Sequence, residues 1–459
     1  MPLEQRNLPR NGDALSLVRN FLDNPSYRAY KELASGALPA DIAEALKSLS
    51  EEECRRLLTL LPSELTADIF QELDIPLQVE LFGVLGIEKT ADIVSEMDSD
   101  DAADLLLELN KDEAESILSN MEEDAEAVKD LLKYEEDSSG GIMASEYVAL
   151  NENWDVTRAF DELRVICPDS DKAYYVYVVD DERHLKGVLS LRDLVMANTT
   201  DKIADIMSSN VMSVKVDSDQ EEAAYIFKKY GFLSLPVVDD ENRLTGIISS
   251  NDIIHVLEDE TTEDIHKMSA TLPLEDTYLA SGIVELWSKR VVWLLALFIT
   301  GAFTSSIMRS NEAILGQFVT LIFFVPMLID EGGNAGSQAS AIIIRALALR
   351  EFDLSDYLKV IWKETKVSLM LGISIGLMGF AAASIMPSEQ LLWSQSGTIV
   401  GLSTLLVVLF GSVIGSLLPL AAHLVGFDPA VLSGPVVTTI VDSAGLLIYF
   451  YIAKSVLGI

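Results

Sequence analysis

The sequence has few of the residue types that build redox, zinc or hydrolytic centres. Its 459 residues include two cysteines, Cys54 and Cys167, and four histidines. The cysteines lie in no CxxC or Cys/His spacing, which argues against a disulfide framework or a zinc site and favours a reducing cytoplasm. Walker, Ser/His/Asp and metal-hydrolase spacings are also missing. An enzyme is therefore the least favoured class of function.

Basic residues are scarce as well. There are 33 Lys and Arg against 72 Asp and Glu, a formal net charge of −39, so the chain would repel nucleic acid. Residues 289–459 hold 9 basic and 10 acidic residues, which leaves a net charge of −38 on residues 1–288. An acidic polar part followed by a nearly neutral apolar part predicts a soluble region joined to a membrane domain.

The apolar part contains five runs near the length that crosses a hydrocarbon core of roughly 30 Å. Five such runs favour membrane helices over the buried helices of a soluble protein. No signal peptide precedes the acidic part, and Lys and Arg cluster on the flanks that a cytoplasmic N-terminus would place inside. We therefore expect a multi-pass protein of the cell (inner) membrane with its C-terminus outside. The predicted spans are Val291–Met308, Ala313–Ile329, Val367–Ser388, one within Leu391–Phe427, and Pro429–Ala453.

Two features break the usual rules for lipid-facing sequence. Asp442 lies near the middle of the fifth predicted span, where a carboxylate is costly unless it faces water, a cation or protein. A functional role is the favoured interpretation. The alternative is a protonated Asp442 that is hydrogen-bonded between helices, with Thr438, Thr439 and Ser443 as partners.

The second feature is the run Asp330–Gln338, DEGGNAGSQ, which follows Pro326 and interrupts the second apolar run. Its glycines and amides predict irregular backbone, which is tolerated at membrane depth where it lines a cavity. The alternative is an ordinary polar loop before an amphipathic segment, Ala341–Leu349.

Two stretches, PMLIDEGGNAGSQASAIIIRALA and DPAVLSGPVVTTIVDSAGLLIYF, resemble the MgtE family of magnesium channels and transporters, and the resemblance covers the whole chain. It implies Mg²⁺ as the substrate, a homodimer around one pore, and Asp442 as the cation-binding residue of that pore. Ser337 stands where the family often has a second Asn. The other pore positions that it implies are Gly333, Asn334, Ala335, Thr438 and Thr439.

The chemistry of the ion agrees with that resemblance. Mg²⁺ needs octahedral oxygen ligands and gives up water reluctantly, so proteins usually hold it with one or two carboxylates. A transition-metal transporter would more often present His, Cys or Met. The apolar part has His423 but no cysteine.

An internal repeat occupies the end of the acidic part. VVDD recurs at 178–181 and 237–240, and GVLSLRDLV at 187–195 matches GIISSNDII at 246–254, each with an offset of 59. Both copies alternate short β-rich runs with amphipathic helical patterns. They resemble a tandem pair of CBS domains.

Such pairs often bind adenosine nucleotides, so the resemblance implies ATP as a ligand. The contacts that it implies are Arg192, Asp193 and Phe232. Asp193 and Asp252 could equally be N-caps of the helices that follow them.

The region before the repeat carries short stripes of Leu, Ile and Ala with acidic outer faces, which predict stacked helices in a superhelical domain. Asp100 and Asp104 would share a helix face, where like charges repel unless a cation lies between them. The resemblance makes both of them Mg²⁺ ligands at the contact with the CBS pair. A solvated acidic surface or an adaptation to salt remains the alternative.

A second acidic run, VLEDETTEDIHKM, follows the repeat and begins the connector to the first span. Such a run is usually a solvated surface, but the resemblance implies a plug helix that lies by the pore mouth when Mg²⁺ is bound. His255 stands where some members have a carboxylate. The Mg²⁺ ligands implied in this region and beyond it are Asp219, Glu221, Asp252, Glu260, Glu263, Asp264 and Asp428.

The predicted fold class is multidomain: an α-helical superhelical N-domain, an α/β tandem CBS pair, a connecting plug helix and a five-span α-helical membrane domain. We expect the protein to carry Mg²⁺ into the cell through a pore that closes when cytoplasmic Mg²⁺ binds. Two alternatives are a transporter for another divalent cation that nucleotide regulates, and a membrane-anchored sensor with no conducting path. The predicted domains are 1–135, 136–200, 201–257, 258–288 and 289–459.

Overall fold

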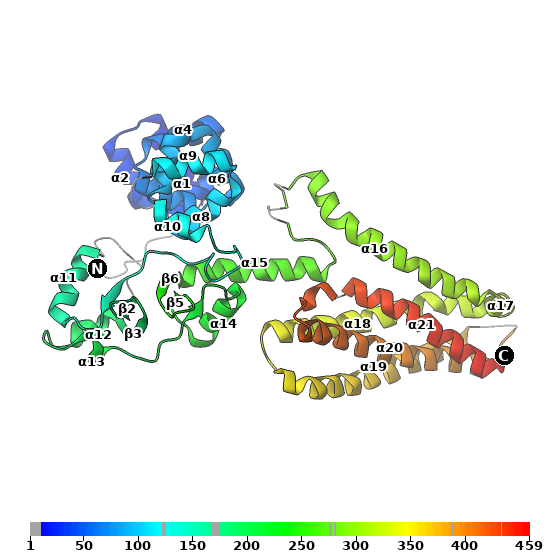
Figure 1. The fold of residues 1–459 in the computed structure, drawn as a ribbon. Helices are drawn as coiled ribbons and strands as arrows, with labels where there is room; N and C mark the ends of the chain where they lie inside the picture. The colour runs from blue at the N-terminus through cyan, green and yellow to red at the C-terminus, as the bar shows by residue number, and fades with distance from the viewer. Residues whose placement is uncertain are drawn as a thin grey trace. The chain divides into compact units, whose positions relative to one another are not determined.

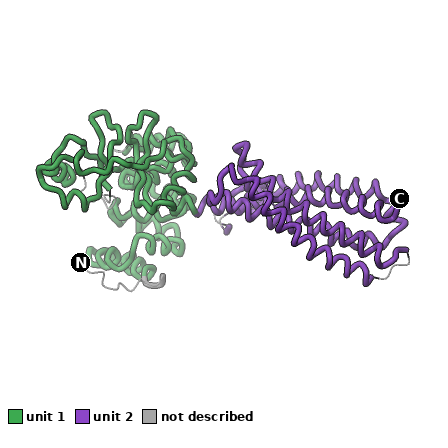
Figure 2. The backbone as a smooth tube through the Cα atoms, turned by 90° about the horizontal axis from the view of Figure 1, so that it is seen from below, with its two compact units in different colours: residues 1–257 green, residues 258–459 purple. Residues whose placement is uncertain are grey.

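The computed structural model describes residues 11–121, 125–166, 175–274, 278–279, 281–386, 390–432 and 434–459. They form two compact units, residues 1–257 and 258–459 (Figure 2). Helix α15, Ser250–Met268, begins in the first unit and ends in the second. Cys54 is buried and unpaired, whereas Cys167 lies outside the described residues.

Short helices make up the beginning of the first unit (Figure 1). Next-but-one neighbours pack together, α3 on α5, α5 on α7 and α7 on α9, because helices this short are stable only when an apolar face is covered. Their core includes Leu33, Phe70 and Ile93. The helices are α1 Asn11–Asp23, α2 Tyr27–Gly36, α3 Pro39–Leu46, α4 Glu51–Leu60, α5 Ser63–Gln71, α6 Ile75–Leu85, α7 Ile87–Val94, α8 Ser99–Glu108, α9 Lys111–Asn120 and α10 Ala125–Leu131.

Two small mixed sheets follow, and they confirm the internal repeat. In each sheet the middle strand pairs in parallel with the first and antiparallel with the third. Tyr175 pairs with Ser190, and Ser234 pairs with Ser249, again 59 residues on. The first sheet and its helices are β1 Ala149–Asn151, α11 Val156–Ile166, β2 Tyr175–Val179, β3 Leu185–Ser190, α12 Leu191–Met196 and α13 Ile203–Ile206. The second sheet comprises β4 Val214–Lys215, β5 Ser234–Val238 and β6 Leu244–Ser249, with α14 Gln220–Tyr230 after β4.

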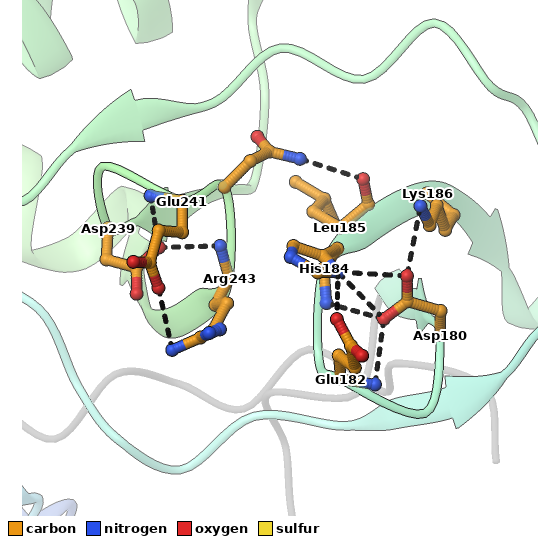
Figure 3. A network of polar contacts seen from close by, with 9 residues as sticks. Asp180, Glu182, His184, Leu185, Lys186, Asp239, Glu241 and Arg243 are labelled. Atoms are coloured by element: carbon orange, nitrogen blue, oxygen red, sulfur yellow. Dashed lines mark hydrogen bonds and ion pairs between the residues drawn. The ribbon is translucent and has the colours of Figure 1, made fainter.

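The two VVDD turns of the repeat lie side by side (Figure 3). The Leu185 N–H of one turn donates to the Asn242 carbonyl of the other at 2.9 Å. These contacts tie the two copies together as a pair. In each turn one aspartate accepts hydrogen bonds from the backbone two and four residues later, Asp180 from Glu182 and His184, and Asp239 from Glu241 and Arg243.

Long helices dominate the second unit (Figure 1). Among the residues that the structure describes, four segments are long and apolar enough to cross a membrane: Ile283–Ser310, Leu354–Ile385, Trp393–Leu424 and Pro429–Leu457. The first, third, fourth and fifth predicted spans overlap them, although Ser388 lies outside the described residues. The elements are α16 Ile283–Ser310, α17 Glu312–Gln317, η1 Val319–Phe324, α18 Val325–Ala348, η2 Leu354–Asp356, α19 Tyr357–Ile385, α20 Trp393–Leu424, η3 Pro429–Leu432 and α21 Gly434–Leu457.

The second predicted span, Ala313–Ile329, is wrong as a single helix. The short helix α17 ends at Gln317, the 3₁₀ helix η1 follows, and α18 begins at Val325. Pro326 explains the new start, because its fixed φ and missing N–H suit the first turn of a helix and not the interior.

The expected irregular backbone at Asp330–Gln338 is also wrong, since the run lies inside α18. Its glycines serve packing instead. A Cβ placed on Gly336 would lie 2.6 Å from Val437 Cγ1 and 3.0 Å from the carbonyl oxygen of Gly411. Small residues of this kind let helix backbones approach closely, so α18 packs directly against α20 and α21.

Candidate cation path and regulatory sites

Asp442 lies on α21 and is half-buried against the side of α18 that carries Gly333. A Cβ on Gly333 would lie 3.1 Å from Thr438 Cγ2 and 3.9 Å from Asp442 Oδ1, so the two helices bring these three residues together. Because residue 333 has no side chain, the carboxylate of Asp442 lies close to the backbone of α18.

The hydroxyl groups considered as partners of a protonated Asp442 have other hydrogen bonds. Thr438 and Thr439 both donate to the Pro435 carbonyl, at 3.0 and 2.8 Å. Ser443 shares a 3.0 Å hydrogen bond with Thr304 of α16. Both threonines therefore donate within α21 and not to the Asp442 carboxylate, while their oxygens keep lone pairs that can accept a hydrogen bond.

Asp330 is a candidate that the sequence interpretation missed. It is exposed on α18, one turn before Gly333, and it is near enough to Asp442 for the two carboxylates to interact electrostatically. A helical interpretation of this run would have placed Asp330 on the same face as Gly333, because residues three apart on a helix share a face. Asn334 is exposed and Ala335 is half-buried on the same helix.

A triad of charged groups joins α15 to the loop before η3. Lys267 Nζ lies 2.6 Å from Glu263 Oε1 and 2.8 Å from Asp428 Oδ2. Burial lowers the pKa of Lys267, but the hydrogen bonds from its ammonium to Asp428 and Glu263 raise that pKa by more, so the lysine stays charged. Two of the predicted Mg²⁺ ligands thus share a cation from the chain itself.

The sequence interpretation did not single out Lys267. The i,i+4 spacing of Glu263 and Lys267 was a visible signal for half of the triad. Glu260 and Asp264, also predicted as ligands, are half-buried on the same helix.

Three aspartates meet at the start of α8 in the first unit. Asp98, Asp100 and Asp101 each offer a carboxylate oxygen, and these oxygens lie within 4.8 Å of one another. Carboxylates this close suit a hard divalent cation. Asp98 and Asp101 were not predicted, because their approach depends on how the chain turns into α8.

Asp104 belongs to a different acidic group. Burial raises the pKa of its carboxyl to about 7, and the negative charges of Asp101, Glu136 and Asp252 add to the rise. Asp252 stands at the start of α15, so Asp104 lies where the helical region meets the second sheet domain. The predicted Asp100–Asp104 pair is thus divided between two neighbouring groups.

The acidic candidates in the second repeat have local hydrogen bonds. Asp219 is the N-cap of α14 and accepts from the Glu221 N–H at 2.8 Å. Asp252 accepts from the Ser249 N–H at 2.7 Å, so Ser249, not Asp252, precedes the helix. His255 and Glu221 are exposed.

The nucleotide candidates have similar surroundings. Asp193 is the third residue of α12, in a capping box with Ser190, whose hydrogen bonds hold the pKa of Asp193 below its usual value. Asp193 is therefore not the expected N-cap of α12. Ser190 is the N-cap, and Asp193 is the third helical residue, whose carboxylate accepts hydrogen bonds from Ser190. Arg192 is exposed, and the Phe232 ring stacks on Tyr230 with centroids 5.5 Å apart.

Three family models match the chain. Residues 325–452 match the MgtE model, described as a divalent cation transporter. Residues 37–137 match the MgtE intracellular N domain, and residues 139–199 and 203–259 each match the CBS domain.

Similar proteins cover most of the chain. The magnesium transporter MgtE of Thermus thermophilus is 43% identical over 330 residues, 72% of each chain. The protein of the same name from Bacillus subtilis is 32% identical over 436 residues, 95% of each chain. The crystal structure of the cytosolic domain of the Mg²⁺ channel MgtE in complex with ATP is similar with a TM-score of 0.50 and 35% identity, and it covers 53% of this chain and 99% of that one.

Proposed function

Because this chain belongs to the MgtE family, we propose that it carries Mg²⁺ into the cell and that cytoplasmic Mg²⁺ closes it. The observation that supports this most is Asp442, a carboxylate on an apolar helix that faces the glycines of α18. Hydrated Mg²⁺ is the substrate that such a site suits, because one or two carboxylates can hold it while water completes its coordination.

In this proposal two copies of the chain form one pore. Asp442 of each copy faces the path, with Asp330 nearby and Gly333, Asn334, Ala335, Thr438 and Thr439 along it. Only 6% of the apolar window of α16 is buried within one chain, against 50% for α20 and α21. Lipid and a second copy would cover the remainder.

The proposed membrane topology has five crossings. The four apolar segments supply four of them, and α18, with 24 residues, supplies the fifth around its polar face. With the acidic region in the cytoplasm, the C-terminus is then outside the cell (inner) membrane. We also propose that the domains have the predicted limits and that the N-domain is superhelical. The plug helix lies within 258–288.

Regulation follows from the charge of the cytoplasmic region. At low Mg²⁺ its net charge of −38 favours separated domains, whereas bound Mg²⁺ neutralises the carboxylate groups and favours the compact, closed state. The sites are Asp100 and Asp104 on α8, Asp219, Glu221 and Asp252 in the second repeat, and Glu260, Glu263, Asp264 and Asp428 at the connector. ATP bound at Arg192, Asp193 and Phe232 would tune the response.

A second candidate is a transporter for another divalent cation that nucleotide regulates. The broader description of the matched family and the ATP complex of the similar cytosolic domain favour considering it. Competition between Mg²⁺ and other divalent cations for uptake distinguishes the two candidates.

The test is ²⁸Mg²⁺ uptake into proteoliposomes by the wild type and by Asp442→Asn. We expect Asp442→Asn to lose most uptake, and Asp353→Asn, an exposed aspartate of the same unit, to retain it. Equal uptake by wild type and Asp442→Asn would contradict the proposed pore.

A further inference from the structure

The triad of Glu263, Lys267 and Asp428 is built from two distant segments. Glu263 and Lys267 are one turn apart on α15, whereas Asp428 precedes η3, in the loop between α20 and α21. The Ala430 N–H donates to Asp428 Oδ1 at 2.8 Å, which leaves Oδ2 directed at the lysine. A single ammonium therefore bridges two carboxylates that come from separate segments of the chain.

The lysine of this bridge is more sheltered than Lys359, which forms another ion pair of the same unit. The Lys267 side chain is 24% exposed, and its partners Glu263 and Asp428 are 39% and 34% exposed. Lys359, which pairs with Asp356 at 2.6 Å, is 80% exposed. Sheltered charges are screened less by water and salt. The attraction between Lys267 and its two carboxylates is therefore stronger than the attraction between Lys359 and Asp356.

We propose that Lys267 is a tethered cation held between Glu263 and Asp428, and that a divalent cation must displace it in order to bind this pair. The inference rests on the proposed function, in which both carboxylates belong to the regulatory sites. Lys267 then acts as an internal competitor, and the Mg²⁺ concentration that fills the site depends on it.

Two consequences follow from electrostatics. Without Lys267 the carboxylates repel each other at low Mg²⁺, so the end of α15 separates from the Asp428 loop. Without the competitor the same pair binds a divalent cation at a lower concentration, by roughly three- to tenfold for a partly sheltered ion pair.

Hydrogen exchange of the full-length protein in detergent measures both consequences, with MgCl₂ titrated from zero into the millimolar range. Peptides that cover residues 258–274 and 425–432 report on the site. For Lys267→Gln we expect faster exchange than in the wild type without Mg²⁺, and a protection midpoint at three- to tenfold lower Mg²⁺. Lys267→Arg, which keeps a cation, and Lys359→Gln, the exposed control, should match the wild type.

A Lys267→Gln midpoint that is unchanged or higher overturns the proposal, and so does a lack of any Mg²⁺ response in both proteins. If Lys267→Gln does not fold, Glu263→Gln serves instead, and its midpoint must rise; an unchanged midpoint again overturns the proposal. ²⁸Mg²⁺ uptake by wild-type protein reconstituted into proteoliposomes tests the proposed function separately, because wild-type uptake does not depend on any change at Lys267.

Discussion

Alanine at Gly336 tests the close packing of α18, which sequence interpretation did not foresee. The added Cβ would meet Val437 Cγ1 at 2.6 Å and the Gly411 carbonyl oxygen at 3.0 Å. Val437 is fully buried and stiff about χ1, and the carbonyl is backbone, so neither can yield freely and α18 must shift against α20 and α21. Overpacking of this kind costs about 1–3 kcal/mol.

A helical Gly→Ala change also gains stability, by about 0.5–1 kcal/mol, because the unfolded chain loses freedom. We therefore expect Gly336→Ala to lose about 0.5–2 kcal/mol overall, which corresponds to a decrease of a few degrees in Tm. Gly316→Ala is the matched control, since Gly316 is helical in α17 and its Cβ would meet nothing within 4 Å.

The assay is thermal unfolding of the full-length protein in one detergent, with both variants measured side by side. We expect a lower Tm for Gly336→Ala and an unchanged or higher Tm for Gly316→Ala. If Gly336→Ala were as stable as Gly316→Ala, the run Asp330–Gln338 would not be a closely packed helix, and the argument would be refuted.

Three further changes have expected outcomes. Asp104→Asn should stabilise the protein at pH 8 without Mg²⁺ by a few kcal/mol, up to about 4 kcal/mol, because the raised pKa of Asp104 makes its charged form unfavourable in the folded state. The gain should fade as the pH falls from about 7 toward 3.8, which pH-dependent unfolding measures. Added Mg²⁺ should raise the Tm of this variant by less than it raises the Tm of the wild type. Asp330→Asn should lower Mg²⁺ uptake at micromolar Mg²⁺ by about threefold, through the lost attraction near Asp442, and leave closure by cytoplasmic Mg²⁺ unchanged. Phe232→Ala should weaken ATP binding at least fivefold in calorimetric titrations, against an unchanged value for Tyr27→Ala, an exposed ring remote in sequence.

The strongest sequence predictions depended on local patterns. The offset of 59 between the two VVDD turns predicted two equivalent domains, and the paired sheets repeat with that offset. Asp442 stood out because a charge in an apolar span contradicts hydropathy, and that signal needs no tertiary information.

Most of the missed features depended on contacts or turns that sequence periodicity does not record. Glycines at 332, 333 and 336 have poor helix propensity, so the run containing them indicated irregular backbone, but neighbours on α20 and α21 cover those glycines and stabilise the helix. Lys267 meets Asp428 across 161 residues of sequence, which no local periodicity records. The grouping of Asp98 with Asp100 and Asp101 likewise depends on the turn into α8.

The central claim is that one chain both conducts Mg²⁺ and is closed by it. The most direct measurement is Mg²⁺ current through the wild type in excised patches while Mg²⁺ on the cytoplasmic face is raised from zero to 10 mM, a range that spans the weak millimolar sites. The account predicts current at low Mg²⁺ that declines as Mg²⁺ is raised, with the decline shifted to higher Mg²⁺ in Asp100→Asn. A current that is independent of cytoplasmic Mg²⁺ would contradict it.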